Sequence, residues 1–153
     1  MVANLPHARS FRDLLVYRKA RELAREIFRL TAEFPKDEMF SLTSQIRRSS
    51  RAIGANIAEA WAKRRYAKHF ISKLSDADGE QYETQHWIDT AIDCGYWTVE
   101  TGAAFTRTCE EIGRLLGGMT AKASLFCGEP PQALHELAPE YLVNDIPLPT
   151  TDH

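Results

Sequence analysis

The sequence predicts an all-α protein, an antiparallel up-down-up-down four-helix bundle with a Pro-rich C-terminal tail. Three observations lead to this fold class. Apolar residues recur every three or four positions in four long segments, which is the spacing of a buried helix face. The connections between these segments are short, which favours antiparallel neighbours. No segment shows the apolar-polar alternation of strands joined by hairpin turns. We expect the bundle over residues 1–127 and the tail over residues 128–153.

The first two helices are predicted from their apolar pattern and from the residues that interrupt it. The first pattern runs from Asp13 to Phe34 and stops at Pro35, because proline cannot continue a helix. Ser41 is the predicted N-cap of a second helix that extends to Trp61. The middle of that helix is rich in small side chains, so its glycine indicates either a close helix contact or a kink.

The third and fourth helices follow after a basic junction. The third pattern reaches Gly95, a residue suited to the position after a helix C-cap. Thr98 is the predicted N-cap of the fourth helix, whose pattern extends to Phe126. Five of the seven prolines lie in residues 128–153. We therefore expect this tail to lie on the bundle or to be disordered, with a helical turn near residues 132–137.

Composition limits the class of protein. A chain of 153 residues with 44% hydrophobic and 26% charged residues is long enough for one domain with one core. Neither a signal peptide nor a run of about 18 apolar residues is present, so a cytoplasmic protein is expected. Three cysteines without a Cys-x-x-Cys pair suit neither a disulfide framework nor a zinc site. Cys94, Cys109 and Cys127 are predicted to be reduced, half-buried packing residues.

Charge is segregated along the sequence. Between Thr43 and Lys68 lie seven basic residues and one acid, Glu59, whereas the segment from Asp76 to Asp93 holds six acids and no lysine or arginine. The first predicted helix adds four arginines on one face, at Arg18, Arg21, Arg25 and Arg29. One interpretation is that basic and acidic faces neutralise each other within or between subunits.

A second interpretation of the basic segment is contact with the phosphates of RNA or DNA. Guanidinium groups match phosphate geometry, and Trp61 and Tyr66 offer stacking planes for bases. The residues of this tentative surface are Arg47, Arg48, Arg51, Lys63, Arg64, Arg65 and Lys68. The net charge of −2 argues against a general polyanion binder, because such domains are usually basic overall.

Enzyme and metal signatures are weak. Glu83 and His86 have the i, i+3 spacing of di-iron four-helix proteins, but the second copy that such a site requires is absent. We therefore expect no metal or cofactor, and we expect Glu80 and Glu83 to bind neighbouring arginines instead. Asn56 lies among apolar residues, where an amide satisfies the backbone or fixes helix register. The sequence holds no recognisable nucleophile motif or phosphate loop, which predicts a protein that is not an enzyme.

Several short motifs are similar to those of a known family. They are Phe34-Pro35 with Glu38, Leu42-Thr43-x-Gln45-Ile46-Arg47-Arg48, Ile53-Gly54-Ala55-Asn56-Ile57-Ala58-Glu59, Lys73-Leu74-Ser75-Asp76-Ala77-Asp78-Gly79-Glu80, Glu83-Thr84-Gln85, Trp87-Ile88-Asp89 and Cys94-Gly95-Tyr96. Over about residues 11–126 the sequence resembles the four-helix-bundle proteins encoded in intervening sequences of bacterial large-subunit ribosomal RNA genes. The matched polar residues predicted to be structural are Gln45, Asn56, Glu59, Glu80 and Glu83.

The resemblance implies an antiparallel bundle that assembles as a homopentamer around a central channel, with a biochemical role that is mostly unassigned. Related accessory proteins of diversity-generating retroelements are basic pentamers associated with nucleic acid and a reverse transcriptase. Two functions are therefore predicted. The first is a non-enzymatic homo-oligomer joined through a basic face on helices one and two and an acidic face on helix three. The alternative is an accessory protein that binds RNA, DNA or a nucleic-acid enzyme through helix two and the junction after it.

Overall fold

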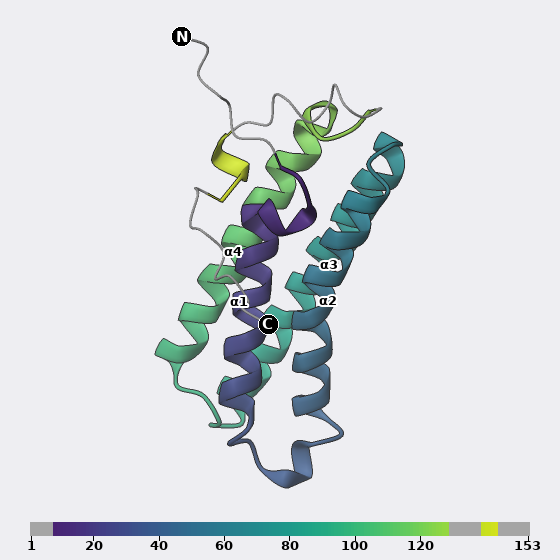
Figure 1. The fold of residues 1–153 in the computed structure, drawn as a ribbon. Coiled ribbons are helices and arrows are strands. Elements are labelled where there is room, and N and C mark those ends of the chain that lie inside the picture. Colours follow the sequence, from purple (N-terminus) through teal and green to yellow (C-terminus); the bar gives the residue numbers. More distant parts are fainter. Residues whose placement is uncertain (1–7, 129–138, 144–153) are drawn as a thin grey trace, which may run out of the picture.

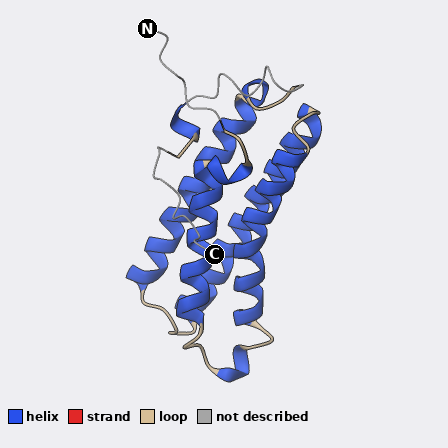
Figure 2. Cartoon of the chain, in the orientation of Figure 1, coloured by secondary structure: helices blue, strands red, loops and turns tan. Residues whose placement is uncertain are grey.

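The computed structural model describes residues 8–128 and 139–143, and within them the chain forms four long α-helices and no strand (Figures 1 and 2). The helices are α1 (Leu15–Thr31), α2 (Leu42–Ala62), α3 (Ala67–Asp93) and α4 (Val99–Ala121). Successive helices run in opposite directions (Figure 1). Because α1 and α3 each pack on α2 and α4, they occupy opposite corners of the bundle. The predicted all-α four-helix bundle is confirmed.

One hydrophobic core runs through all four helices. The largest fully buried side chains of α2, α3 and α4 include Ile46, Ile53, Ile57, Phe70, Leu74, Ile88, Ile112 and Leu116. Burial of each such side chain contributes roughly 1.5–3 kcal/mol of transfer free energy, so these residues set the helix register. None of the helices in the described ranges combines the length and apolar character that a membrane span needs.

Two helix ends differ from the prediction. Asp13 lies in a separate 3-10 turn, Phe11–Asp13, because its carboxylate accepts a hydrogen bond from the Ser10 backbone N–H and caps that turn. At the other end of the chain α4 stops at Ala121, and a tighter turn, Ala123–Leu125, replaces its last predicted residues. Phe126 is nonetheless fully buried, so the apolar spacing correctly identified a core residue beyond the end of the helix.

The connection between α3 and α4 has the two predicted helix-end signals. Gly95 follows the end of α3 with a φ of 77°, a conformation that side chains other than glycine rarely adopt. Thr98 then accepts a hydrogen bond from the Thr101 backbone N–H at 3.1 Å through its hydroxyl. Both predictions are confirmed.

The N-cap residue of α2 is the predicted one, but another side chain makes the capping hydrogen bond. Ser41 occupies the N-cap position, but its side chain makes no capping hydrogen bond. The Glu38 carboxylate accepts the Leu42 backbone N–H at 3.0 Å instead, and its other oxygen accepts the Tyr96 hydroxyl at 3.2 Å. The Phe34 ring lies 5.2 Å from that of Tyr96. Glu38 therefore stabilises the start of α2 and ties the α1–α2 connection to the α3–α4 connection.

The free cysteines differ in their exposure. Cys109 is fully buried, and burial raises the pKa of its thiol to about 12. Cys127 is half-buried, whereas Cys94 is exposed at the C-cap of α3. The prediction of half-buried packing is therefore wrong for Cys94, whose position after the last helical turn directs it away from the core.

Part of the C-terminal tail lies on the bundle. Tyr141 is buried, and its ring packs edge-on against Phe126 with 5.5 Å between the ring centres. Its hydroxyl occupies the space that a Cβ atom would need at Gly118. The Val143 backbone N–H donates to the Asp13 carbonyl at 3.0 Å. The helical turn predicted near residues 132–137 lies outside the described residues.

Candidate functional site

The seven basic residues around α2 do not share one surface. Arg47 faces α1, where its Nε donates to the Thr31 hydroxyl at 2.8 Å and its guanidinium lies 4.5 Å from the centre of the Phe28 ring. It is half-buried, and it also donates to the Phe28 carbonyl. Arg47 therefore joins α1 to α2.

Arg48, the next residue, faces α3 instead. Its guanidinium lies 3.3 Å from the Glu80 carboxylate and also pairs with Glu83. Hydrogen bonding to Glu80 and the charges of both carboxylates raise the pKa of Arg48. The positive charge of Arg48 is therefore neutralised within the chain.

Further polar contacts continue along the same side of α2. The Thr84 hydroxyl donates to the buried Ser49 hydroxyl at 2.9 Å. Toward the other end of the helices, Lys73 lies 2.8 Å from Glu59, and hydrogen bonding to Glu59 raises the pKa of Lys73. These contacts and the Arg48 cluster join α2 to α3 along most of their length, and we call them the α2–α3 polar seam.

Gln45 and Asn56, which were predicted to be structural, make contacts within α2 and its first turn. Gln45 is half-buried, and its backbone N–H donates to the Ser41 carbonyl in the first turn of α2. Asn56 is also half-buried, and its amide donates to the Ala52 carbonyl of its own helix at 2.9 Å. Beside Asn56 lies a shallow hollow of about 340 Å³, lined also by Ser75, Asp76, Gly79, Glu80 and Glu83.

The turn between α2 and α3 carries the remaining basic residues. Arg64 folds back on Trp61, with its guanidinium 4.0 Å from the centre of the indole, and burial lowers the pKa of Arg64. The other residues of the turn are exposed, including a tyrosine with 57% of its surface accessible. We define the tip cluster as Lys63, Arg65, Tyr66, Lys68 and His69. Lys63, Arg65 and Lys68 of this cluster belong to the predicted phosphate surface and are exposed.

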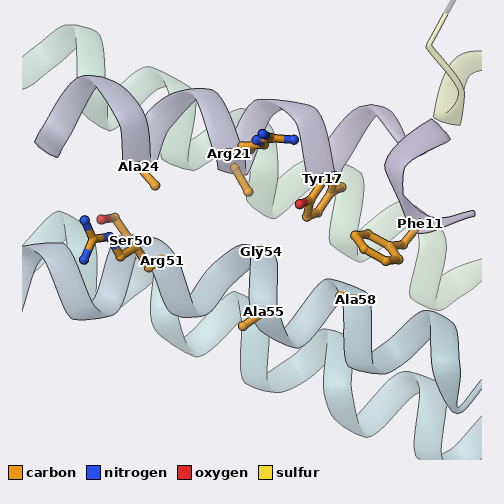
Figure 3. Close-up of a pocket in the computed structure, with 10 residues that line it drawn as sticks. Phe11, Tyr17, Arg21, Ala24, Ser50, Arg51, Gly54, Ala55 and Ala58 are labelled. Atoms are coloured by element: carbon orange, nitrogen blue, oxygen red, sulfur yellow. The ribbon is translucent and has the colours of Figure 1, made fainter. Parts of the chain in front are cut away.

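A groove runs along the outer surface between α1 and α2 (Figure 3). Its volume is about 250 Å³. A Cβ atom added at Gly54 would lie 3.6 Å from the Tyr17 ring, which is an ordinary van der Waals contact. Gly54 therefore marks a helix contact, and α2 continues through it as one helix. The residues that line this α1–α2 groove are Phe11, Tyr17, Ala20, Arg21, Ala24, Ser50, Arg51, Gly54, Ala55 and Ala58.

Arg21 lines the α1–α2 groove on its α1 side, and three further arginines lie along the same helix. Arg29 pairs with Glu26 of its own helix at 2.7 Å, and the Arg18 Nε donates to the Arg12 carbonyl. Arg21 and Arg25 are exposed, and no hydrogen bond or ion pair holds either side chain among the described residues. The outer face of α1 is therefore basic in the folded chain.

The outer face of α3 is acidic and carries one prominent aromatic side chain. Tyr82 is 63% exposed. One turn earlier, a Cβ atom at Gly79 would meet no atom of residues 8–128 and 139–143 within 4 Å. We define the α3 outer face by its exposed residues Asp76, Gly79, Tyr82, His86, Asp89 and Asp93. The apolar pattern of the third predicted helix included Tyr82, and this assignment is wrong, because Tyr82 lies opposite the buried face of α3.

The Glu-x-x-His pair on α3 is not arranged as a metal site. Glu83 pairs with Arg48, whereas His86 contacts the Trp87 ring at 4.7 Å between ring centres. Within residues 8–128 and 139–143, no three histidine, cysteine or acidic side chains are grouped to hold a metal ion.

Similarity to known proteins covers the four helices. Residues 12–118 match the family model of the 23S rRNA-intervening sequence protein. A crystal structure of a protein of unknown function from the S23 ribosomal protein family of Bacteroides thetaiotaomicron VPI-5482 is 32% identical in sequence, with a TM-score of 0.64. The alignment covers 70% of this chain and 96% of that chain. No curated protein matches the sequence. This chain belongs to the 23S rRNA-intervening sequence protein family.

Proposed function

We propose that the protein is a non-enzymatic homo-oligomeric interaction module, which forms a closed cyclic assembly of identical subunits in the cytoplasm. One observation carries this proposal: the basic outer face of α1 and the acidic outer face of α3 lie at opposite corners of one bundle. Among the described residues, no ion pair joins the α1 arginines to the α3 acids. Because the two faces lie at opposite corners of the bundle, they can contact each other only between two copies of the chain.

The arrangement favours a head-to-tail contact. A two-fold dimer through either face alone would bring like charges together, which is unfavourable. Joining the basic face of one subunit to the acidic face of the next leaves one face open at each end, so the contact repeats until it closes. Exposed ion pairs each contribute only about 0–1 kcal/mol, so they select the orientation while apolar burial in the α1–α2 groove supplies affinity.

The native mass tests this proposal. The family resemblance implies five subunits, and five chains of 17.4 kDa have a mass of about 87 kDa. We expect light scattering during size exclusion to give this single mass at micromolar concentration and moderate salt. A closed assembly stops growing, so the mass stays constant as concentration rises. A monomer throughout this range would contradict the proposal.

Nucleic-acid binding is the second candidate, supported by the tip cluster. Arg47, Arg48 and Arg64 are engaged within the chain, so the phosphate-binding hypothesis now depends on the exposed turn. Its exposed lysines suit phosphates, and Tyr66 suits base stacking. In a cyclic assembly whose axis runs along the bundle, all tip clusters emerge at one end, where several weak sites act together.

Charge reversal at the tip tests the second candidate. We expect Lys63→Glu with Lys68→Glu to abolish binding of a fluorescent single-stranded RNA at low salt, as measured by anisotropy, while the native mass stays unchanged. Lys36→Glu is the matched control, because Lys36 is exposed in the connection between α1 and α2, at the opposite end of α2 from the tip cluster. Equal binding by the double variant, or no binding by the wild-type protein at low salt, would rule this candidate out.

A further inference from the structure

We infer that Tyr82 of one subunit inserts into the α1–α2 groove of the next subunit and forms the centre of the contact between copies. The inference rests on the proposed cyclic assembly and names the surfaces that build it. Its occupant is a second copy of this chain, for which the charges, the shape and the position of the two surfaces each supply an argument.

The α1–α2 groove suits an aromatic side chain. Its floor is formed by small residues, so there is room above them for a side chain from another molecule (Figure 3). They are Gly54, Ala55 and Ala58 on α2 and Ala24 on α1. Phe11 and Tyr17 close one end, with their rings edge to face at 4.8 Å. Aromatic side chains bury large areas and favour edge-to-face contacts of this kind. The guanidinium groups of Arg21 and Arg51 at the rim favour an incoming surface that is acidic.

The α3 outer face has the matching features. Tyr82 is exposed, and Gly79 and Ser75, which lie on the same face one and two turns before it, are small. Glycine is among the least favourable residues in a helix interior, yet Gly79 lies near the middle of the 27-residue α3. Among the residues that the structure describes, no packing contact requires a glycine here, because an added Cβ atom would meet no atom within 4 Å. The missing side chain instead lets a neighbouring helix approach the backbone beside Tyr82.

The two surfaces lie at the same level along the bundle. Contacts of Glu80 with Arg48 and of Thr84 with Ser49 put Tyr82 level with this part of α2. The adjoining residues Ser50 and Arg51 line the groove. Rotation about an axis parallel to the helices preserves level, so Tyr82 of one copy meets the groove of its neighbour without sliding along the axis.

The flanking charges then meet in pairs of opposite sign. Because α1 and α3 run in the same direction, with about 1.5 Å of rise per residue, equal steps along each helix keep their residues level. Six residues before Tyr82 lies Asp76, and six residues before Ala24 on the groove lies Arg18. Asp89 similarly falls within one turn of the level of Arg29. Asp76 and Asp89 are therefore level with arginines of the next subunit on the two sides of the inserted tyrosine, and Asp76 also pairs with Lys73 of its own helix at 3.6 Å.

Two substitutions test the contact through native mass. We expect Tyr82→Ser to be monomeric at concentrations where the wild-type protein is assembled. Gly79→Ala should weaken assembly, with a dissociation constant at least tenfold higher. In the monomeric Tyr82→Ser background, the same substitution should raise the denaturation midpoint, because alanine favours the helix. Phe40→Ser is the control, because Phe40 is 93% exposed but lies outside both surfaces, and its assembly should match the wild type.

Cross-linking tests the pairing directly. In a Cys94→Ser background, Tyr82→Cys combined with Ala55→Cys should give a ladder of covalent multimers with a short thiol cross-linker. Each single variant should give no ladder. Dimers from Tyr82→Cys alone would indicate a two-fold contact and overturn the inference. A wild-type assembly that Tyr82→Ser and Gly79→Ala leave intact would overturn this inference alone, whereas a monomeric wild type would overturn the proposed function as well.

Discussion

The two sides of α2 differ in how they use polar residues. Toward α3, the polar seam pairs Arg48 with two carboxylates and Ser49 with Thr84, so most charges are neutralised within the chain. Toward α1, the surface is a groove with a floor of small side chains and arginines at its rim (Figure 3). The polar groups of the α2–α3 polar seam are therefore paired within one subunit, whereas the α1–α2 groove is open to solvent.

This difference separates stability from assembly. Residues of the α2–α3 polar seam should affect the free energy of unfolding of the single chain and have little effect on its oligomeric state. Residues of the α1–α2 groove should do the reverse. Because assembly itself raises apparent stability by mass action, the comparison requires a monomeric background, for which Tyr82→Ser is the expected choice.

The largest expected effect within the seam is at Thr84. Thr84→Val keeps the shape of the side chain but removes the hydroxyl that donates to the buried Ser49. We expect a loss of about 1–1.5 kcal/mol, the net contribution of one buried hydrogen bond between helices, because the Ser49 hydroxyl keeps its bond to the Ile46 carbonyl. Chemical denaturation in the monomeric background measures it. Thr90→Val is the control, because the Thr90 hydroxyl bonds only within its own exposed turn, and an equal loss there would contradict the account.

Arg48 and Arg51 should differ in a smaller effect on the free energy of unfolding. Arg48→Met leaves Glu80 and Glu83 without their counter-ion, and we expect a loss of about 1 kcal/mol, since the ion pairs are only partly covered. Arg51→Met on the groove side should change the unfolding free energy by less than about 0.5 kcal/mol. Native mass should show the opposite order, with Arg51→Met weakening assembly and Arg48→Met leaving it unchanged. Equal effects of both variants on either quantity would remove the distinction between the two sides.

The smallest expected effect is the pH dependence of the Glu59–Lys73 pair. Hydrogen bonding to Lys73 lowers the pKa of Glu59 below its ordinary 4.5. The pair therefore stabilises the fold above that pH, and the contribution is lost as pH falls through the lowered folded pKa. We expect the difference in unfolding free energy between wild type and Lys73→Met to be present at neutral pH and to shrink below pH 4.5. A difference that stays constant down to pH 3 would show that the charge pair contributes nothing.

Local rules predicted the helices well. The apolar spacing depends only on neighbouring residues, and it identified four helices and core residues such as Phe126, which lies beyond the end of α4. Thr98 and Gly95 act within one turn of themselves, so their roles as N-cap and C′ residue were also predictable. The same rule placed Ser41 correctly at the N-cap position of α2. It missed the capping hydrogen bond, which comes from Glu38 of the preceding turn, because Glu38 is held there by Tyr96 of a distant connection.

The distribution of charge was less predictable than the helices. Arg47 and Arg48 are adjacent in sequence but point to different helices, because successive residues are separated by about 100° around a helix. Which partner each one meets depends on the register of α2 against α1 and α3, and core packing determines that register. The α1–α2 groove depends on two helices together, so the small residues of either sequence segment did not reveal it.

Native mass of charge-swapped variants tests the central claim most directly. Arg18→Glu with Arg29→Glu places acids opposite Asp76 and Asp89 on the α3 outer face of the next subunit, and we expect a monomer because like charges then meet. Adding Asp76→Lys and Asp89→Lys to the same chain restores opposite signs and should restore the assembly. The account predicts a monomer for the first variant and the wild-type mass for the second. An assembly that tolerates the first change, or that the second fails to restore, would contradict a contact between these two faces.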